Sequence, residues 1–325
     1  MPVLRLQSMA QPKVTPGAYR RMTLVALVMV ATIIVTGAAV RLSGSGLGCP
    51  DWPNCDRSTL VGVANSHQVI EQVNRLFTGA MMVALIVTVL GSLRRVPRRR
   101  DLTRLSLALV VGVVAQGVVG GIVVRTHLHP AAVQLHYVLS IVIVTAAMVL
   151  HRRAGEDARA DGTVVHRATV PARVARHVRA VVVLLGATLL AGTVVTGSGP
   201  HSGSASDPSK IRRFGFAVSS VARVHSALVW ATLLATLGLA LRLRGTSHRR
   251  VLDDALSLFV LAALAQGGVG YVQYALGVPA GLVGLHVLGS VIVWIAALNL
   301  WLTCRTAASA TAVLDDTIGA AAALR

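Results

Sequence analysis

Residues 105–124 read LSLALVVGVVAQGVVGGIVV, an apolar stretch long enough to cross the hydrocarbon core of a bilayer as a helix. Its inner part, Val-Ala-Gln-Gly-Val-Val-Gly-Gly at 114–121, recurs as Leu-Ala-Gln-Gly-Gly-Val-Gly-Tyr at 264–271. A histidine follows each Gln by the same spacing, at His136 and His286. This pattern predicts a membrane span that is duplicated along the chain, with one histidine site for each copy.

The composition extends this prediction to the whole chain. Of its 325 residues, 54% are apolar and only 13% are charged, whereas soluble proteins carry about 25% charged residues. We therefore expect an all-α polytopic membrane protein. The first apolar run is a span rather than a signal peptide, since no small-residue cleavage site follows it. The eight expected spans are about Met22–Val40, Val69–Leu93, Leu105–Val124, Ala131–Leu150, Ala180–Gly197, Val218–Leu241, Ala255–Leu276 and Ala280–Thr303.

The net charge of +19 is a topology signal rather than a sign of nucleic-acid binding. Most of the 31 Lys and Arg residues lie before the first span, in the loops that follow even-numbered spans, and in the tail. By the positive-inside rule, both termini are expected in the cytoplasm of a bacterial cell, with the chain in the plasma membrane. The basic loops would contact anionic lipid, and no nucleic-acid partner is expected.

The duplication divides the chain into two halves of four spans each. Because each half has an even number of spans, both copies point the same way, which predicts two parallel four-helix repeats about a pseudo-twofold axis along the membrane normal. The expected parts are a cytoplasmic N-terminus (1–21), an N-terminal half (22–150), a cytoplasmic linker (151–179), a C-terminal half (180–303) and a disordered cytoplasmic tail (304–325).

Polar side chains within the expected spans are few. Gln116 and Gln266 need partners in lipid, either another helix or a cofactor edge. The glycines beside them allow close helix packing or leave room for a flat ring. Ionisable groups in lipid are costly and mark functional sites by default. These ionisable residues are His67, Glu71, Arg75, His136, Arg223, His225 and His286.

Three of these histidines, His136, His225 and His286, share a depth of about 10 Å below the outer boundary. His225 and His286 lie on different helices of one half, a pattern suited to bis-imidazole ligation of haem iron. Zinc is disfavoured because a third and a fourth ligand are lacking. The alternative is that each histidine is a structural hydrogen bonder.

The N-terminal half departs from this symmetry. Alignment of the second span on the sixth places Asn74 opposite His225, and Glu71 opposite an alanine. Glu71 and Asn74 share one helix face with His67. We interpret this half as the reactive site and the symmetric half as the electron-transfer site. The alternative for Glu71 is an ion pair with Arg75, four residues later.

Four arginines lie toward the outer ends of spans: Arg41, Arg75, Arg125 and Arg223. They would pair with haem propionates or extend to lipid headgroups, and the sequence favours neither. Cys49 and Cys55 enclose two prolines and a tryptophan in the first outer loop. A disulfide is expected there, with two free thiols as the alternative. Cys304 is expected to be a free thiol.

These motifs together resemble the heme A synthase family. The resemblance covers about residues 20–303. It is carried by Thr-Gly-Ala-Ala-Val-Arg-Leu-Ser-Gly-Ser-Gly-Leu-Gly-Cys-Pro-Asp-Trp-Pro-Asn-Cys at 36–55, by Ile-Glu-Gln-Val-Asn-Arg at 70–75 and by Thr-Gly-Ser-Gly-Pro-His at 196–201. His136, His225 and His286 complete the pattern.

The resemblance implies oxidation of the C8 methyl of haem O to the formyl group of haem A for cytochrome c oxidase. It implies that His225 and His286 ligate a haem b cofactor, that His136 holds the substrate haem, and that Glu71 is the essential carboxylate. It also implies a Cys49–Cys55 disulfide in the loop. Many members have a second histidine ligand where this chain has Asn74.

Two other functions fit parts of the pattern. A non-catalytic di-haem cytochrome b that exchanges electrons with quinone would explain the histidines and the duplication, but not the Glu71 asymmetry. A transporter with parallel repeats would explain the duplication alone. For the synthase, the implied partners are an electron donor and the farnesyltransferase that makes haem O. In place of the missing ligand, His67 is the alternative contact for the substrate haem.

Overall fold

The structure, a computed structural model, describes residues 13–156, 166–205, 209 and 211–307. Eight helices within these residues are long and apolar enough to cross a membrane, which confirms the predicted all-α multi-pass architecture. Their bounds are α1 Pro16–Leu42, α2 Ser66–Arg94, α3 Arg100–Arg125, α4 Pro130–Ala154, α5 Ala172–Ser198, α6 Val218–Leu243, α7 His248–Ala275 and α8 Ala280–Thr303.

Most helices run beyond the apolar stretches that predict them, because local capping decides where they start. Helix α1 begins at Pro16, which needs no backbone N–H there, and the Thr15 side chain accepts from Ala18 N. Helix α2 begins at Ser66, where Asn65 accepts a hydrogen bond from Gln68 N at 2.9 Å. Hydropathy records only the part of each helix that suits lipid.

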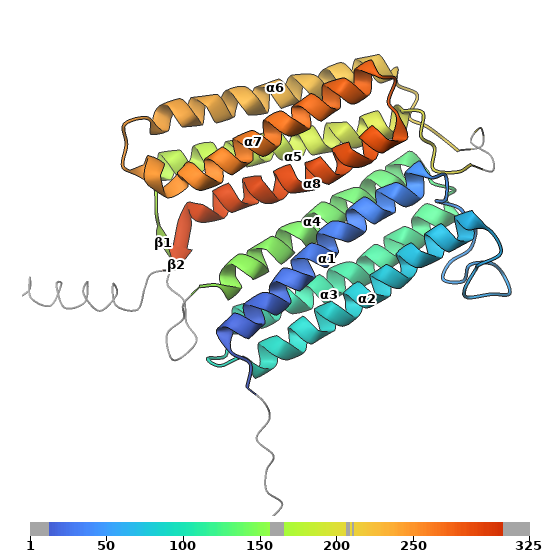
Figure 1. Cartoon of the computed structure of the whole chain (residues 1–325), viewed down its shortest axis with the longest axis horizontal. Coiled ribbons are helices and arrows are strands. Elements are labelled where there is room, and N and C mark those ends of the chain that lie inside the picture. The colour runs from blue at the N-terminus through green and yellow to red at the C-terminus, as the bar shows by residue number, and fades with distance from the viewer. Residues whose placement is uncertain (1–12, 157–165, 206–208, 210, 308–325) are drawn as a thin grey trace, which may run out of the picture.

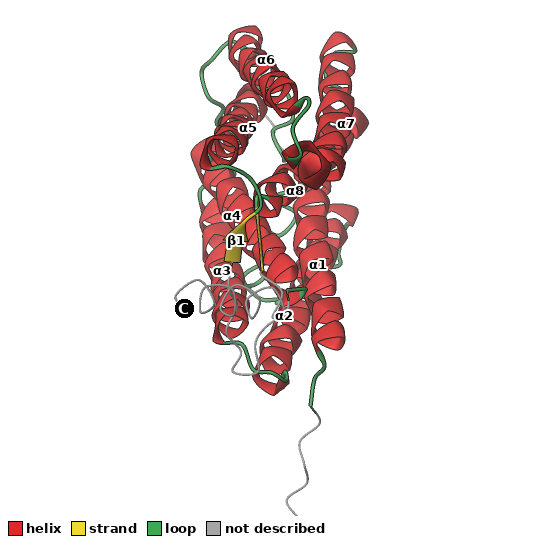
Figure 2. Cartoon of the chain, turned by 90° about the vertical axis from the view of Figure 1, so that its left-hand side faces the viewer, coloured by secondary structure: helices red, strands yellow, loops and turns green. Residues whose placement is uncertain are grey.

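The helices form two groups of four that lie side by side (Figure 1), α1–α4 and α5–α8. Viewed from one end, α4, α1 and α8 lie in the middle of the bundle (Figure 2), where each contacts the other two. Side chains join the groups inside the apolar core. Trp294 Nε1 donates to Thr145 Oγ1 at 2.9 Å, and Gln134 Nε2 donates to Thr193 Oγ1 at 2.8 Å. Contacts between the two groups are made by α1, α4, α5 and α8, so α2, α3, α6 and α7 lie away from this interface.

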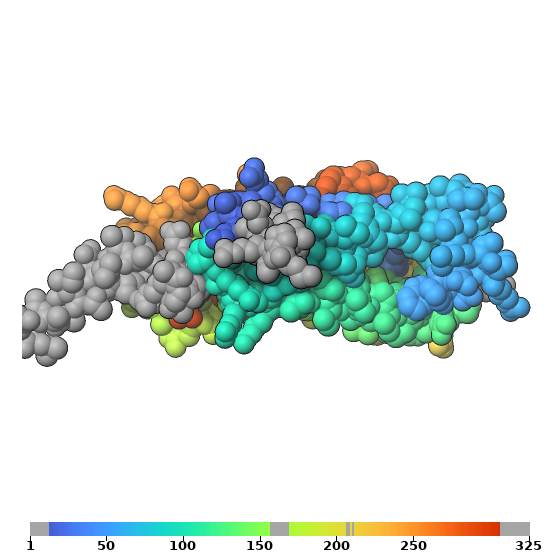
Figure 3. All heavy atoms as spheres, turned by 90° about the horizontal axis from the view of Figure 1, so that it is seen from below, coloured from blue at the N-terminus to red at the C-terminus, as the bar shows by residue number. Residues whose placement is uncertain are grey.

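The two ends of the bundle differ. At one end, called the loop end below, the segment between α1 and α2 gathers into a compact loop (Figure 3). This loop pairs with the loop that follows α5, where Gly46 N donates to Gly203 O at 2.8 Å and Ala205 N donates to Gly44 O at 2.9 Å. At the other end, the three-residue strands β1 (His166–Ala168) and β2 (Arg305–Ala307) pair antiparallel. These short strands were not predicted.

Several sequence predictions concern residues outside the described part. Residues 1–12 of the N-terminus, 157–165 of the linker and 308–325 of the tail are among them. Cys304 is a buried free thiol, as predicted. The pseudo-twofold relation between the halves stays a prediction.

Candidate functional site

The C-terminal half brings two histidines together from different helices. His225 of α6 and His286 of α8 have ring centroids 6.3 Å apart, and their planes meet at 76°. His225 Nδ1 lies 3.0 Å from Thr188 O. A carbonyl oxygen can only accept, so Nδ1 carries the proton and Nε2 keeps a free lone pair. Gln266 Nε2 lies 3.0 Å from His286 Nδ1. An amide nitrogen donates, so Nδ1 accepts in this contact and the proton of the neutral ring is on Nε2, which makes no hydrogen bond to a described residue.

Glycines on the neighbouring helices make room for both rings. A Cβ at Gly192 would lie 3.2 Å from His225 Cε1, and a Cβ at Gly270 would lie 3.0 Å from His286 Cε1. Gln266 also donates to His286 O at 2.7 Å, and a Cβ at Gly289 would collide with its Oε1. The duplicated Gln and Gly residues thus hold the histidine backbone and ring in place.

The donor set of this half fits a haem. Two imidazoles that bind one metal at about 2 Å from each nitrogen have ring centres about 6 Å apart, close to the observed 6.3 Å. Both Nδ1 atoms have partners in the protein, so Nε2 is the nitrogen of each ring that would face a metal; His225 offers a lone pair there, and His286 would do so once its Nε2 proton is lost. Neutral imidazole pairs on bundle helices are an established form of haem ligation.

The N-terminal half repeats half of this arrangement. Gln116 Nε2 donates to His136 O at 2.8 Å and also to Ser140 Oγ. A Cβ at Gly120 would lie 3.4 Å from His136 Cε1. His136 Nδ1 is buried and has no hydrogen-bond partner among the described residues. A buried imidazole nitrogen without a partner fits a position where a bound group supplies the contact.

The opposite side of this half lacks the second ring. Asn74 of α2 accepts a hydrogen bond from Thr36 Oγ1 of α1 at 2.8 Å through its Oδ1. Beside it, a Cβ at Gly37 would meet nothing within 4 Å. His67 lies two turns nearer the loop end, where its Nδ1 is 2.9 Å from Ser45 Oγ. His67 is therefore engaged at the loop end, and Asn74 stays the residue that the alignment sets opposite His225.

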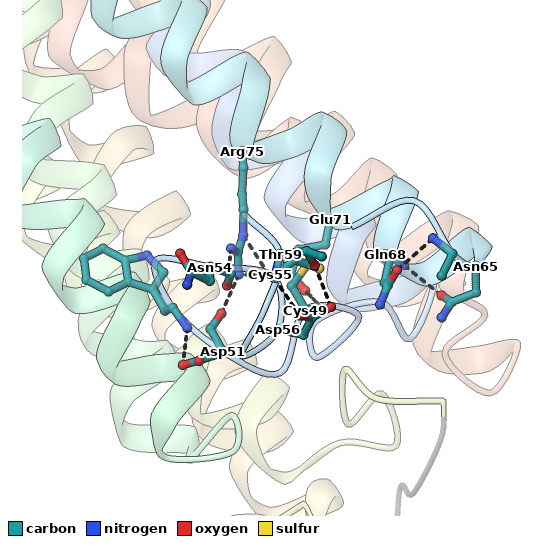
Figure 4. Close-up of a disulfide and its surroundings, with 12 residues drawn as sticks. Cys49, Asp51, Asn54, Cys55, Asp56, Thr59, Asn65, Gln68, Glu71 and Arg75 are labelled. Atoms are coloured by element: carbon teal, nitrogen blue, oxygen red, sulfur yellow. Dashed lines mark hydrogen bonds and ion pairs between the residues drawn. A yellow bond between two sulfur atoms is a disulfide. The ribbon is translucent and has the colours of Figure 1, made fainter. Parts of the chain in front are cut away.

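Glu71 is buried and binds the loop that the two cysteines close (Figure 4). Its Oε2 accepts from Cys49 N at 2.8 Å, and its Oε1 accepts from Arg75 Nη2 at 2.7 Å and from Arg75 Nε at 3.1 Å. The ion pair weighed as the alternative for Glu71 is thus present. Cys49 and Cys55 form the predicted disulfide.

Three of the four arginines expected near propionates bind loop carbonyls. Arg75 Nη1 donates to Pro53 O and Asn54 O at 3.1 Å each, and Nη2 donates to Asp51 O at 3.2 Å. Arg41 donates to His201 O at 2.9 Å, and Arg125 donates to Trp52 O at 3.3 Å. Arg223 is exposed and contacts only Ser220 of its own helix among the described residues. Of the four, Arg223 has the fewest competing contacts.

Some contacts around these sites have no clear signal in the sequence. The Trp52 indole of the loop packs where a Cβ at Gly121 would lie 2.8 Å from Cδ2, so this glycine receives the loop. The equivalent residue in the C-terminal half is Tyr271, whose hydroxyl contacts Ser226 Oγ at 2.7 Å and accepts from Trp230 Nε1 at 3.0 Å. In the sequence, these contacts are indicated only by the difference between Gly121 and Tyr271 at the same position of the duplicated motif.

Side chains within the two loops at the loop end stabilise their conformation. Hydrogen bonds from Thr59 and Ser58 hold the pKa of the Asp56 carboxyl below its usual range. In the neighbouring loop, Arg213 donates to Thr196 O at 2.7 Å and to Gly199 O, and burial lowers its pKa. At the loop end, the described residues of both loops are therefore tied by hydrogen bonds to one another and to the helix ends.

Comparison with known proteins agrees with this arrangement. The profile of the COX15-CtaA family, described as cytochrome oxidase assembly protein, matches residues 20–68 and 61–298. Curated relatives named heme A synthase include those of Alkalihalophilus pseudofirmus, 28% identical over 131 residues, and Lysinibacillus sphaericus, 27% identical over 119 residues. The matched segments cover 40% and 36% of this chain.

The same matched segments span less than half the length of those relatives, at 44% and 39%. A Bacillus cereus protein of the same name is 25% identical over 36% of this chain and 38% of its own length. The family profile, in contrast, runs through all eight helices. The chain belongs to the COX15-CtaA family of cytochrome oxidase assembly proteins, the group to which the heme A synthase resemblance pointed.

Proposed function

We propose that this chain is a heme A synthase, an oxidoreductase that converts the C8 methyl of haem O to the formyl group of haem A. The observation that carries the proposal is the His225–His286 pair, with its rings 6.3 Å apart, both Nδ1 atoms bound to protein groups and neither Nε2 atom in a hydrogen bond with a described residue. A bound haem b would supply one-electron chemistry at this pair. The histidines hold that cofactor, and Thr188 and Gln266 set the orientation of their rings.

The N-terminal half is the proposed place of reaction. His136 would bind the substrate haem O, with Gln116 fixing the backbone on which the imidazole stands. The loop over this half, closed by Cys49 and Cys55, excludes water from the site. No comparable disulfide closes the described part of the C-terminal half, where the cofactor stays bound.

Glu71 is the proposed essential carboxylate. Its Oε2 accepts a hydrogen bond from Cys49 N. A proton transferred to this oxygen would convert it to an O–H donor, which would then face the N–H donor of Cys49. The loop contact would then weaken, which couples a proton transfer at Glu71 to the release of the loop. Arg75 keeps the other oxygen in place throughout. If Glu71→Ala left haem A production intact in membranes, this role would be wrong.

The test of the function is pigment extraction from purified protein, produced in a host that makes haem O. We expect haem O or haem A beside haem B in the wild type. His225→Ala should lose haem B, while His136→Ala should keep haem B and lose the substrate haem. Haem B alone in every sample would favour the second candidate, a non-catalytic di-haem cytochrome b, and colourless protein would favour a transporter.

We also propose an orientation and partners. Both termini would lie in the cytoplasm and both haem sites toward the outer face, since basic residues concentrate at the terminal side of the helices. Alkaline phosphatase fused after Thr303 should then be inactive, whereas a fusion in the 43–65 loop should be active. An electron donor and the farnesyltransferase that makes haem O are the partners that this activity requires.

A further inference from the structure

Asn74 is the position at which the two halves differ most in donor chemistry. In the C-terminal half, the His225 ring lies against Gly192 of α5 and contacts Thr188 O. In the N-terminal half, the equivalent glycine is Gly37 of α1, and the space beside it is open. A histidine ring at residue 74 would fill that space. The shorter Asn74 side chain instead bonds to Thr36 Oγ1.

The direction of the Asn74 amide follows from this contact. Oδ1 accepts the Thr36 hydroxyl proton at 2.8 Å, which turns the amide nitrogen, Nδ2, away from α1. No described residue accepts a hydrogen bond from Nδ2. An amide nitrogen is a poor iron ligand because its lone pair is delocalised, but its two N–H groups are good donors. Since the alignment of the two halves sets Asn74 at the position of His225, we expect these donors to face the site from the side opposite His136.

Within the part of the chain that the structure describes, the three other polar side chains considered for this position, His67, Glu71 and Gln116, make contacts elsewhere. His67 lies seven residues before Asn74, or about 10 Å along the helix axis, and its ring is bound to Ser45. Both Glu71 oxygens are engaged by Arg75 and Cys49 N. Gln116 donates through Nε2 to His136 O and Ser140 Oγ, which ties this amide to the helix of His136, and its buried Oε1 has no partner among the described residues. The site thus offers one imidazole on one side and an amide donor on the other.

We propose that a haem held by His136 keeps its second axial position free of protein ligands, and that Asn74 donates a hydrogen bond to a small molecule bound there. The ligand class is a diatomic molecule or a small anion, such as oxygen, carbon monoxide or cyanide. This inference rests on the proposed function, because it requires a haem in the N-terminal half. It makes the two halves chemically unequal: one is closed to external ligands and the other is open.

The test uses purified full-length protein in detergent with its haem content measured first. With two haems per chain, the dithionite-reduced protein should bind one carbon monoxide per two haems, and the oxidised protein should show one high-spin and one low-spin haem. Asn74→His should place a ring beside Gly37, abolish carbon monoxide binding and convert the high-spin signal to low spin. His225→Asn makes the mirror change and, in the fraction of chains that keeps haem B without this ligand, should open the C-terminal half to carbon monoxide as well.

Asn74→Ala tests the hydrogen bond from Asn74 separately from the absence of a second protein ligand. It should keep the same stoichiometry but release cyanide from the oxidised protein about fivefold to tenfold faster, the effect of one lost hydrogen bond. Unchanged cyanide release would overturn the donor role. Two low-spin haems and no carbon monoxide binding in the wild type would overturn the open position, and a gain of binding in His67→Ala would then identify His67 as the ligand. One haem per chain would overturn the proposed function itself.

Discussion

The contact between Glu71 and the disulfide loop gives the sharpest quantitative prediction. Glu71 accepts one hydrogen bond from Cys49 N and two from Arg75. In Glu71→Gln, one oxygen remains as an acceptor, and the new NH₂ group must face either Arg75 or Cys49 N–H, both donors. The variant therefore loses at least one charge-assisted hydrogen bond, about 1.5–3 kcal/mol. This corresponds to an increase of about 10- to 150-fold in the population of the open loop.

Amide hydrogen exchange of the loop measures this population directly. In Glu71→Gln, protection of the Cys49 amide should fall by the same factor, with the disulfide intact and the helix amides unchanged. The matched control is Asp253→Asn. Asp253 forms an ion pair with Arg249 at the same four-residue spacing, but its side chain is half exposed and the pair is 3.5 Å long. Neutralising an exposed pair should change protection less than about threefold.

Protection of Cys49 that stays within threefold of the wild type in Glu71→Gln would refute the reasoning. It would mean that the disulfide and the Arg75 contacts to loop carbonyls hold the loop without the carboxylate. A similar loss in Asp253→Asn would point instead to a general destabilisation of the bundle.

Four further outcomes are expected. Gly270→Val should at least halve the haem b content, because its Cβ would lie 3.0 Å from His286 Cε1; Gly267→Val, with nothing within 4 Å, is the control for this pigment assay. Tyr271→Phe removes the contacts with Ser226 and Trp230 and should speed haem b transfer to an apo-globin acceptor. Trp294→Phe loses the bond to Thr145 and should cost about 1–2 kcal/mol in detergent unfolding, unlike Trp301→Phe at the surface. Cys304, whose pKa burial raises to about 11, should react with maleimide at pH 7.5 only after unfolding.

The predicted spans agreed with the structure in number and type, and their ends did not. Hydropathy detects the residues that suit lipid, so it missed the capped first turns of α1 and α2. The disulfide was predicted from two cysteines close together in an outer loop, and the structure confirms it. For Arg75, the choice between haem propionates and lipid headgroups stays a prediction, and in the structure its nitrogens bind Glu71 and three loop carbonyls.

Periodic apolar runs and a repeated Gln-Gly motif were enough to establish eight membrane helices and to mark His136, His225 and His286, because lipid tolerates few other sequences. The sequence did not determine which of these side chains contact one another, because that depends on how the helices pack. The ring spacing of His225 and His286, the Thr36 contact that turns Asn74, and the loop that holds Glu71 all join residues far apart in the chain. Such contacts follow from how helices pack and rotate against one another, which a one-dimensional pattern leaves undetermined.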